Sequence, residues 1–393
     1  MNAIPRSTET GSSCASIKVG DRFEVTIEDV AFGGEGVARR EGFVVFVPFV
    51  LLNELVEVEV VEVKRRFARA RLIQVSRASA DRVTPVCPYF AACGGCQYQH
   101  ASYATQLQMK FKQVSSIMGR IARLSDPPID AVIPCPRPYN YRNRIMVRSH
   151  WNRPKQGLDI GFLRCDSRLV EDIESCSIAE PALNEKLSEV RRHPPPKGGL
   201  KVELRVMPDN WELPRDSFFQ NNFYLLPELV ATVRRKLESS AARYLIDAYC
   251  GVGFFSVELA DLVDRFVGVE SDPRAVAAAR RNAAARGRFN GDYIEGRTED
   301  CLESVMQQFP AAETALILDP PRRGCLASTL DFIGQTRPLQ VLYISCHPAT
   351  LARDLRILTE QAGYRLERVT PLDLFPQTQH VECVTDLRLR KSQ

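Results

Sequence analysis

The chain has 393 residues, enough for two or three domains. Hydrophobic residues make up 45% and charged residues 25%, which is typical of a globular protein and excludes a disordered or collagen-like chain. The formal net charge of +4 is too small to indicate a nucleic-acid-binding protein, so a polyanion site has to come from local clusters of basic residues.

Two further features of the composition suggest where the protein works. No apolar run approaches the roughly 18 residues needed to cross a bilayer, and residues 1–16 lack the hydrophobic core of a signal peptide. This predicts a cytoplasmic protein that does not bind membranes. In such a protein, clustered cysteines indicate metal binding or catalysis rather than disulfides, and this chain has twelve cysteines.

The N-terminal part is predicted to be a tail followed by a small barrel. Residues 1–16 are rich in Ser and Thr and are expected to be disordered. Residues 17–78 contain short strand-like runs separated by turn residues: Phe23–Ile27, Phe32–Gly36, Phe43–Val47, Leu55–Val63 and Ala68–Val75. Five short strands at this spacing are typical of a β-barrel of the oligonucleotide-binding kind.

Two stretches carry a strong local excess of positive charge. Residues 64–82 hold seven Lys and Arg against one acid, and residues 137–155 hold six against none. In the second stretch the cations alternate with Tyr139, Tyr141, His150 and Trp151. Cations bind phosphates and aromatic rings stack on unpaired bases, so this composition suits single-stranded RNA. A solvated surface is the alternative for either stretch.

The middle of the chain is predicted to form a separate domain, at 79–215. Residues 105–124 have apolar residues at helical spacing, which predicts an amphipathic helix whose apolar side faces a core: Leu107, Phe111, Val114, Met118 and Ile121. The Pro- and Gly-rich run 193–199 marks a loop or domain junction. From 216 to 393, apolar strands alternate with helical stretches, as in a doubly wound α/β domain.

Three cysteines lie close together in the central part. Cys87 is followed by Cys93 and Cys96, and Gly94-Gly95 between the last two lets the backbone turn tightly. Thiolates arranged in this way suit zinc or an iron–sulfur cluster, and a single triplet with a remote ligand favours iron and sulfur. The candidates for a fourth ligand are Cys135, Cys165 and Cys176, and the spacing does not choose among them.

The α/β part begins with a cofactor signal. A buried strand leads through Tyr249-Cys250-Gly251-Val252-Gly253 into a helix, and a ligand is expected at that turn. Ser256 stands where a dinucleotide fingerprint needs a third glycine, which disfavours a pyrophosphate. Glu270 ends the next strand, about 20 residues after the turn, where a carboxylate can accept both ribose hydroxyls. A glycine turn and a ribose acid without a phosphate site indicate S-adenosylmethionine.

Three later residues are candidates for chemistry at the same sheet edge. Asp319 ends a strand and is followed by two prolines, which make its loop rigid. Cys346 lies between a strand and a helix that starts at Pro348, where a helix N-terminus is expected to lower the thiol pKa and create a nucleophile. Glu382 lies at a loop-to-strand junction and is a candidate general base. An inert buried cysteine and a surface glutamate are the plain alternatives.

Taken together, the motifs resemble one family, the S-adenosylmethionine-dependent RNA uracil-5-methyltransferases, and most closely its iron–sulfur members that methylate 23S ribosomal RNA. The resemblance runs over most of the chain and in the family's order. It is carried by Gly33–Arg39, Cys93–His100, Phe219–Asn222, Asp319–Arg322, Ser345–Asp354 and His380–Glu382.

The resemblance implies a fold in three parts. These are a TRAM β-barrel at 17–78, a central α+β iron–sulfur domain with RNA contacts at 79–215, and a Rossmann-like class I methyltransferase domain at 216–393. It implies that Cys87, Cys93, Cys96 and Cys176 hold a [4Fe–4S] cluster. With four protein ligands that cluster would be structural or RNA-positioning.

The resemblance also implies roles at the α/β edge. Gln220, Tyr249, Gly251, Glu270 and Asp319 would line the cofactor and target-base site, with Cys346 as nucleophile and Glu382 as base. The chain departs from the family in having Phe254 after Gly253, where a polar residue is usual. Only 43 residues separate Cys176 from Gln220, fewer than in the ribosomal enzymes.

The leading expectation is therefore methylation of carbon 5 of a uridine in 23S ribosomal RNA, without an obligate protein partner. The same chemistry on transfer RNA or another RNA is the alternative substrate. A non-catalytic RNA-binding or assembly protein is the alternative class, and a methyltransferase with zinc in place of the cluster is a third hypothesis.

Overall fold

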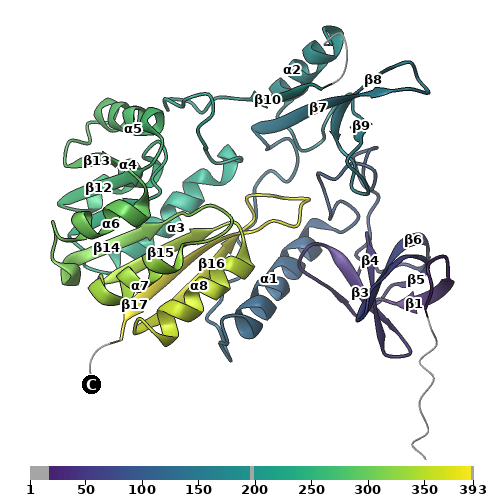
Figure 1. The fold of residues 1–393 in the computed structure, drawn as a ribbon, viewed down its shortest axis with the longest axis horizontal. Helices are drawn as coiled ribbons and strands as arrows, with labels where there is room; N and C mark the ends of the chain where they lie inside the picture. The colour runs from purple at the N-terminus through teal and green to yellow at the C-terminus, as the bar shows by residue number, and fades with distance from the viewer. Residues whose placement is uncertain (1–16, 195–198, 391–393) are drawn as a thin grey trace, which may run out of the picture. The chain divides into compact units, whose positions relative to one another are not determined.

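The computed structural model describes residues 17–194 and 199–390 (Figure 1). The predicted tail at 1–16 lies outside the described residues, as does most of the predicted junction at 193–199. The chain divides into two compact units, 1–84 and 85–393. The predicted boundaries at 78/79 and 215/216 stay predictions.

The first unit is a β-structure with its own core. Its six strands form one sheet in the order β1-β5-β6-β4-β3-β2. They are β1 (Arg22–Thr26), β2 (Asp29–Val30), β3 (Glu35–Arg40), β4 (Phe43–Pro48), β5 (Leu55–Val63) and β6 (Phe67–Arg77). In the first part of β5, the buried Val56, Val58 and Val60 alternate with the partly exposed Glu57 and Glu59, so one side of the strand packs inward and the other faces outward.

The strand predicted at Phe32–Gly36 lies further along the chain than expected. Residues 32–34 form the turn between β2 and β3, in which Gly33 and Gly34 adopt φ of +113° and +89°. Only Glu35 and Gly36 of the expected run belong to a strand, which then continues to Arg40. The glycines specify the turn because they reach positive φ without strain.

The second unit begins with a helix and a small antiparallel sheet. They comprise α1 (Tyr103–Arg120), β7 (Arg144–Asn152), β8 (Gly157–Leu163), β9 (Val170–Asp172), α2 (Pro181–Arg192) and β10 (Lys201–Arg205). The sheet order is β10-β7-β8-β9. Ile145 and Val147 of β7 form a core with Leu183 and Leu187 of α2, and the alternate side chains of β7 are only partly buried.

Helix α1 differs from its prediction. Its buried residues include Gln106, Lys110 and Gln113, whereas Phe111 is 39% exposed. The stripe expected to face a core is therefore turned partly outward. The helix buries polar side chains because they have partners: Gln113 bonds to Tyr98, and the partners of Gln106 and Lys110 lie in the last quarter of the chain.

The rest of the second unit is a seven-stranded sheet covered by helices. Its order is β13-β12-β11-β14-β15-β17-β16, in which β17 alone runs antiparallel to both neighbours. Helices α3, α4 and α5 pack on one face of the sheet, and α6, α7 and α8 pack on the other (Figure 1). The predicted doubly wound α/β architecture is confirmed.

The bounds of these elements follow the alternation seen in the sequence. The strands are β11 (Tyr244–Ala248), β12 (Arg265–Glu270), β13 (Gly291–Glu295), β14 (Thr314–Leu318), β15 (Gln340–Ser345), β16 (Tyr364–Leu372) and β17 (Glu382–Leu389). The α-helices are α3 (Leu226–Glu238), α4 (Phe254–Leu259), α5 (Pro273–Ala285), α6 (Thr298–Met306), α7 (Ala327–Thr336) and α8 (Pro348–Glu360). Among the described residues, no helix has the length and apolar character to cross a membrane.

Candidate active site

The predicted site residues of the α/β part gather at one edge of the large sheet. Gly251, Glu270, Asp319 and Cys346 follow or end four parallel strands, so all four lie at the carboxyl edge. Glu382 starts the antiparallel β17, whose Cys383 pairs with Ser345 of β15. This register places Glu382 at the same edge, beside Cys346.

The glycine turn after β11 has the geometry that its residues predict. Gly253 caps α4 with φ of +81°, and a Cβ there would come within 2.6 Å of the Tyr293 hydroxyl. The buried Asp247 accepts the backbone N–H of Ser256 at 2.9 Å, which holds the start of α4 against the strand. A Cβ on Gly251 would meet no described atom within 4 Å, so open space adjoins this turn.

Glu270 and Tyr249 flank that space. The Glu270 carboxylate accepts the backbone N–H groups of Gly251 at 3.1 Å and Asp272 at 2.8 Å, which fixes its position. Tyr249 adopts φ of +65°, unusual for a residue with a Cβ, and its hydroxyl donates to Glu299 at 3.3 Å. Burial raises the pKa of the Tyr249 phenol, which therefore stays protonated.

Gln220 and Phe254 lie on the other side of the turn. The Gln220 side chain is buried, and its backbone carbonyl accepts the Asn143 amide at 2.9 Å. Phe254 is buried among Trp211, Phe219 and Phe255, with ring centroids 5.1–5.4 Å apart. The phenyl ring thus belongs to an aromatic cluster, where a polar side chain would lose this packing.

Cys346 is half-buried between β15 and α8. Burial raises the pKa of its thiol to about 11, and the Glu382 carboxylate adds to this rise. The expectation that the helix N-terminus lowers this pKa is therefore wrong for the free protein. Burial of the thiol and the nearby Glu382 raise the pKa by more than the helix N-terminus lowers it.

Arg322 is the functional residue to which the sequence reasoning gave no role. The positive charge of its guanidinium opposes the rise of the Cys346 thiol pKa. It also opposes the rise of the Glu382 pKa. The two prolines before Arg322 and the bond from the Thr350 hydroxyl to its carbonyl (3.0 Å) hold it over the site. The Asp-Pro-Pro-Arg motif contained this signal, because a cation is what a thiolate needs.

The two carboxyl groups of the site are also perturbed. Burial raises the pKa of Glu382 well above its usual value, and Asp319 adds to that rise. Burial raises the pKa of Asp319 to about 7. A carboxylate with a raised pKa is a stronger proton acceptor, so Glu382 has the property that a general base needs.

The two histidines near the site have different positions. His347 caps α8, since its ring nitrogen accepts the Thr350 N–H at 3.3 Å. His380 lies 3.3 Å from the Arg322 guanidinium, and burial lowers the pKa of its imidazole to about 3. His380 is therefore neutral at physiological pH.

Comparisons with known proteins match this architecture over nearly the whole chain. Residues 198–390 match the tRNA (Uracil-5-)-methyltransferase family, and residues 17–73 match the TRAM domain. A protein of Bacillus cereus described as an uncharacterized RNA methyltransferase is 31% identical, with 93% of this chain and 96% of that protein aligned. The tRNA (uracil(54)-C(5))-methyltransferase of Schizosaccharomyces pombe is 32% identical over 93% of this chain and 77% of that protein.

This chain belongs to the RNA uracil-5-methyltransferase family. It is an enzyme of the EC 2.1.1 class that methylates carbon 5 of uracil in RNA with S-adenosylmethionine as cofactor, and its N-terminal part is a TRAM domain. The crystal structure of the Pyrococcus abyssi tRNA (uracil-54, C5)-methyltransferase has the same fold, with a TM-score of 0.66. It is 23% identical and covers 93% of this chain and 100% of its own. The predicted non-catalytic alternative is not supported.

The four predicted cluster cysteines of the methyltransferase interact electrostatically, and their role as cluster ligands stays a prediction. Cys87, Cys93, Cys96 and Cys176 affect one another electrostatically, and burial raises the pKa of Cys93 to about 12. The backbone N–H of Gly95 donates to the Cys93 sulfur at 3.4 Å. Yet within 17–194 and 199–390, no group of three or more Cys, His, Asp or Glu side chains is arranged to hold a metal ion.

The other two candidates for a fourth ligand have different surroundings. The Cys135 thiol contacts the Asn222 amide at 3.2 Å, next to the sheet edge. The Cys165 thiol donates to the Ala91 carbonyl at 2.9 Å. Of the three candidates, Cys176 is the one whose thiol interacts electrostatically with Cys93 and Cys96, and its role as fourth ligand stays a prediction.

Many charges of the two basic stretches are neutralised internally. In the TRAM unit, Arg69 pairs with Glu35 and Arg71 with Glu59 at 3.0 Å each. In the central sheet, Lys155 pairs with Asp159 at 2.9 Å, and Tyr141 is buried with its hydroxyl on the Pro376 carbonyl. Trp151 is 45% exposed and remains available for stacking. RNA contact through these stretches stays a prediction.

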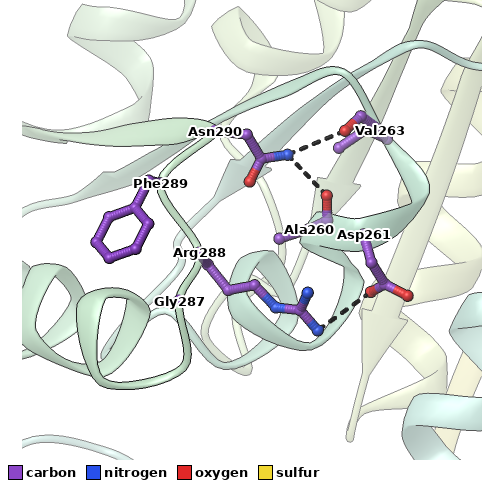
Figure 2. A pocket seen from close by; sticks show the side chains of 7 residues that line it. All are labelled: Ala260, Asp261, Val263, Gly287, Arg288, Phe289 and Asn290. Carbon is purple, nitrogen blue, oxygen red and sulfur yellow. Dashed lines mark hydrogen bonds and ion pairs between the residues drawn. The ribbon is translucent and has the colours of Figure 1, made fainter.

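A shallow groove lies at the opposite edge of the large sheet (Figure 2). It is lined by Ala260, Asp261, Val263, Gly287, Arg288, Phe289 and Asn290, which precede β12 and β13. The Asn290 amide donates to two backbone carbonyls there, and Arg288 pairs with Asp261 (Figure 2). The candidate catalytic residues are at the carboxyl edge, so this groove is not the reaction site.

Proposed function

We propose that this methyltransferase acts on a uridine of 23S ribosomal RNA, with Cys346 as nucleophile and Glu382 as general base. The observation that carries the chemical part is the convergence of Cys346, Arg322 and Glu382 at the carboxyl edge of the sheet. A thiol, a cation that favours its thiolate and a buried carboxyl group are the three groups that this reaction needs.

The reaction begins at the pyrimidine ring. Carbon 5 of uracil is a weak nucleophile, so the Cys346 thiolate adds to carbon 6 and the ring becomes an enolate. The guanidinium of Arg322 favours the thiolate at this step. When bound, S-adenosylmethionine would supply the electrophilic methyl group that carbon 5 accepts, and S-adenosylhomocysteine would be the leaving group. The target base has to be unstacked to reach Cys346.

The second half of the reaction releases the product. The Glu382 carboxylate removes the proton from carbon 5, the electron pair of that bond forms the carbon 5–carbon 6 double bond, and the carbon 6–sulfur bond breaks. Cys346 leaves as the thiolate. Because burial raises the pKa of Glu382, its carboxylate is a stronger base than an exposed glutamate.

The cofactor is proposed to bind at the glycine turn. The open space next to Gly251 admits a ligand close to the backbone, and Glu270 is held where it can accept ribose hydroxyls. Tyr249, Gln220 and Asp319 surround the same edge. No step requires Phe254, whose ring is buried in its aromatic cluster.

Incubation with labelled S-adenosylmethionine and ribosomal RNA tests the chemistry. We expect 5-methyluridine from the wild-type protein and none from Cys346→Ala. Undiminished methyl transfer by Cys346→Ala would overturn the mechanism.

The identity of the RNA is tested separately. The names of the similar proteins from Schizosaccharomyces pombe and Pyrococcus abyssi specify uracil 54 of transfer RNA, which makes transfer RNA the second candidate. Mapping 5-methyluridine in total cytoplasmic RNA with and without this protein distinguishes them. Loss from 23S RNA supports the proposal, and loss confined to transfer RNA replaces it.

We also propose that Cys87, Cys93, Cys96 and Cys176 hold a [4Fe–4S] cluster. The support is the electrostatic interaction among the four thiols and the backbone N–H of Gly95, which donates to the Cys93 sulfur. Bound in this way, the cluster would stiffen the loop and leave no open iron for chemistry. Protein purified without oxygen should absorb near about 400 nm and contain about four irons per chain. Colourless protein with stoichiometric zinc would contradict the proposal.

A further inference from the structure

The connection between β16 and β17 carries Glu382 at its end. It spans residues 373–381, long for an antiparallel pair, and it has no regular secondary structure of its own. A loop of this length does not fix the first residue of the following strand by itself. Pairing with Leu372 of β16 fixes the backbone of Glu382, and the contacts of the loop determine how residues 379–381 lead into it.

The segment that follows Cys96 holds this loop directly. The backbone N–H groups of Gln97 and Tyr98 both donate to the Gln377 carbonyl, at 3.0 Å each. The Gln97 side chain then accepts the backbone N–H of Gln379 through Oε1, at 3.1 Å. Gln379 is three residues before Glu382.

Side chains of helix α1 also bind this loop. The Gln106 amide exchanges two hydrogen bonds with Gln377, at 2.9 and 3.0 Å. Lys110 pairs with Asp373 at 2.5 Å and donates to the Phe375 carbonyl at 3.0 Å, and all of these groups are buried. Gln377 has φ of +68°, a strained value that persists because bonds on several sides determine it.

We propose that Gln97 is a positioning residue for proton removal, acting through its hydrogen bond to Gln379. The loop that carries Cys87, Cys93 and Cys96 then supports the catalytic base Glu382, in addition to any metal group that its cysteines bind. This inference rests on the proposed function, since it takes Glu382 as the base that acts after methyl transfer.

Two substitutions in the full-length protein separate this role from a purely local one. Gln97 also donates from Nε2 to the Gly94 carbonyl at 3.0 Å, inside its own loop. Gln97→Glu loses that donor but keeps an acceptor for Gln379. Gln97→Met keeps the shape and loses both. Both variants thus lose the hydrogen bond to the Gly94 carbonyl, and they differ in whether residue 97 can still accept the Gln379 N–H.

The test measures turnover on ordinary RNA and covalent complex formation on RNA containing 5-fluorouridine. Fluorine at carbon 5 cannot leave as a cation, so this RNA reports the steps before proton removal. We expect Gln97→Met to slow turnover roughly tenfold, as for a partly buried backbone amide left without its partner, and Gln97→Glu to stay within about twofold of wild type. All three proteins should form the covalent complex at the same rate.

Each other result overturns the inference. Normal turnover by Gln97→Met removes the role, and equal defects in both variants assign Gln97 to the cysteine loop alone. A covalent complex that forms as slowly as turnover places the defect before proton removal. Absence of a covalent complex from the wild-type protein would instead overturn the proposed function, and the inference with it.

Discussion

Cys346 lies where the proposed nucleophile is needed, and in the free protein its thiol is protonated at neutral pH. Burial and Glu382 raise the pKa of its thiol to about 11, while Arg322 opposes that rise. The thiolate is the reactive form, so Cys346 stays unreactive until the bound uracil changes the solvation and charge around its thiol. This limits side reactions of an accessible cysteine.

The raised pKa predicts the pH dependence of alkylation. Below the folded pKa, the thiolate fraction grows about tenfold per pH unit, so modification of Cys346 by iodoacetamide should rise at that rate from about pH 7 to about pH 9. Mass spectrometry of the peptide containing Cys346 measures it. A plateau near pH 8 would show that the thiol pKa is not raised.

Arg322 should matter for this reactivity and its neighbour should not. Arg322→Met removes the cation that lowers the pKa of the Cys346 thiol, so alkylation at pH 8 should slow several-fold. Arg323→Met, one residue further along the same exposed loop, is the matched control and should react like wild type. Equal rates in all three proteins would reject the role of Arg322.

At the scale of elements, α1 and the loop 373–381 depend on each other. The helix buries the ammonium of Lys110, and burial lowers the pKa of that group, so the Asp373 carboxylate is required as its partner. Such a pair is costly to break because the remaining charge is left without compensation.

Breaking this pair should cost stability. Lys110→Met leaves Asp373 buried alone, and the free energy of unfolding should fall by about 3–5 kcal/mol. The double variant Lys110→Met/Asp373→Asn has no uncompensated charge and should recover a large part of the loss. Chemical denaturation of the three proteins measures this, and a double variant as unstable as the single one would contradict the argument.

At the scale of the whole molecule, the TRAM unit has its own sheet and core. Removal of residues 1–84 should therefore leave the thermal stability of the remaining unit and its affinity for S-adenosylmethionine unchanged, while RNA binding weakens. Calorimetry and RNA binding at two salt concentrations check this, because lost cations also reduce the salt dependence. Loss of cofactor binding in the shortened protein would contradict the division.

Much of this architecture could be predicted from the sequence, because strand ends and turns are encoded locally. The glycine turn, Glu270 and Cys346 were identified from residues next to them in the chain. The buried polar face of α1 could not be, since Lys110 and Asp373 are 263 residues apart. The predicted lowering of the Cys346 pKa was wrong because it also depends on residues distant in the sequence: burial raises this pKa, and Glu382, from a different strand, adds to the rise.

The central claim is that Cys346 attacks carbon 6 and Glu382 ends the reaction, and Glu382→Gln tests it most directly. This variant should accumulate a covalent complex with RNA that resolves slowly. Mass spectrometry should find a methylated uridine attached to the peptide that contains Cys346. Normal turnover by Glu382→Gln, or attachment at another residue, would contradict the account.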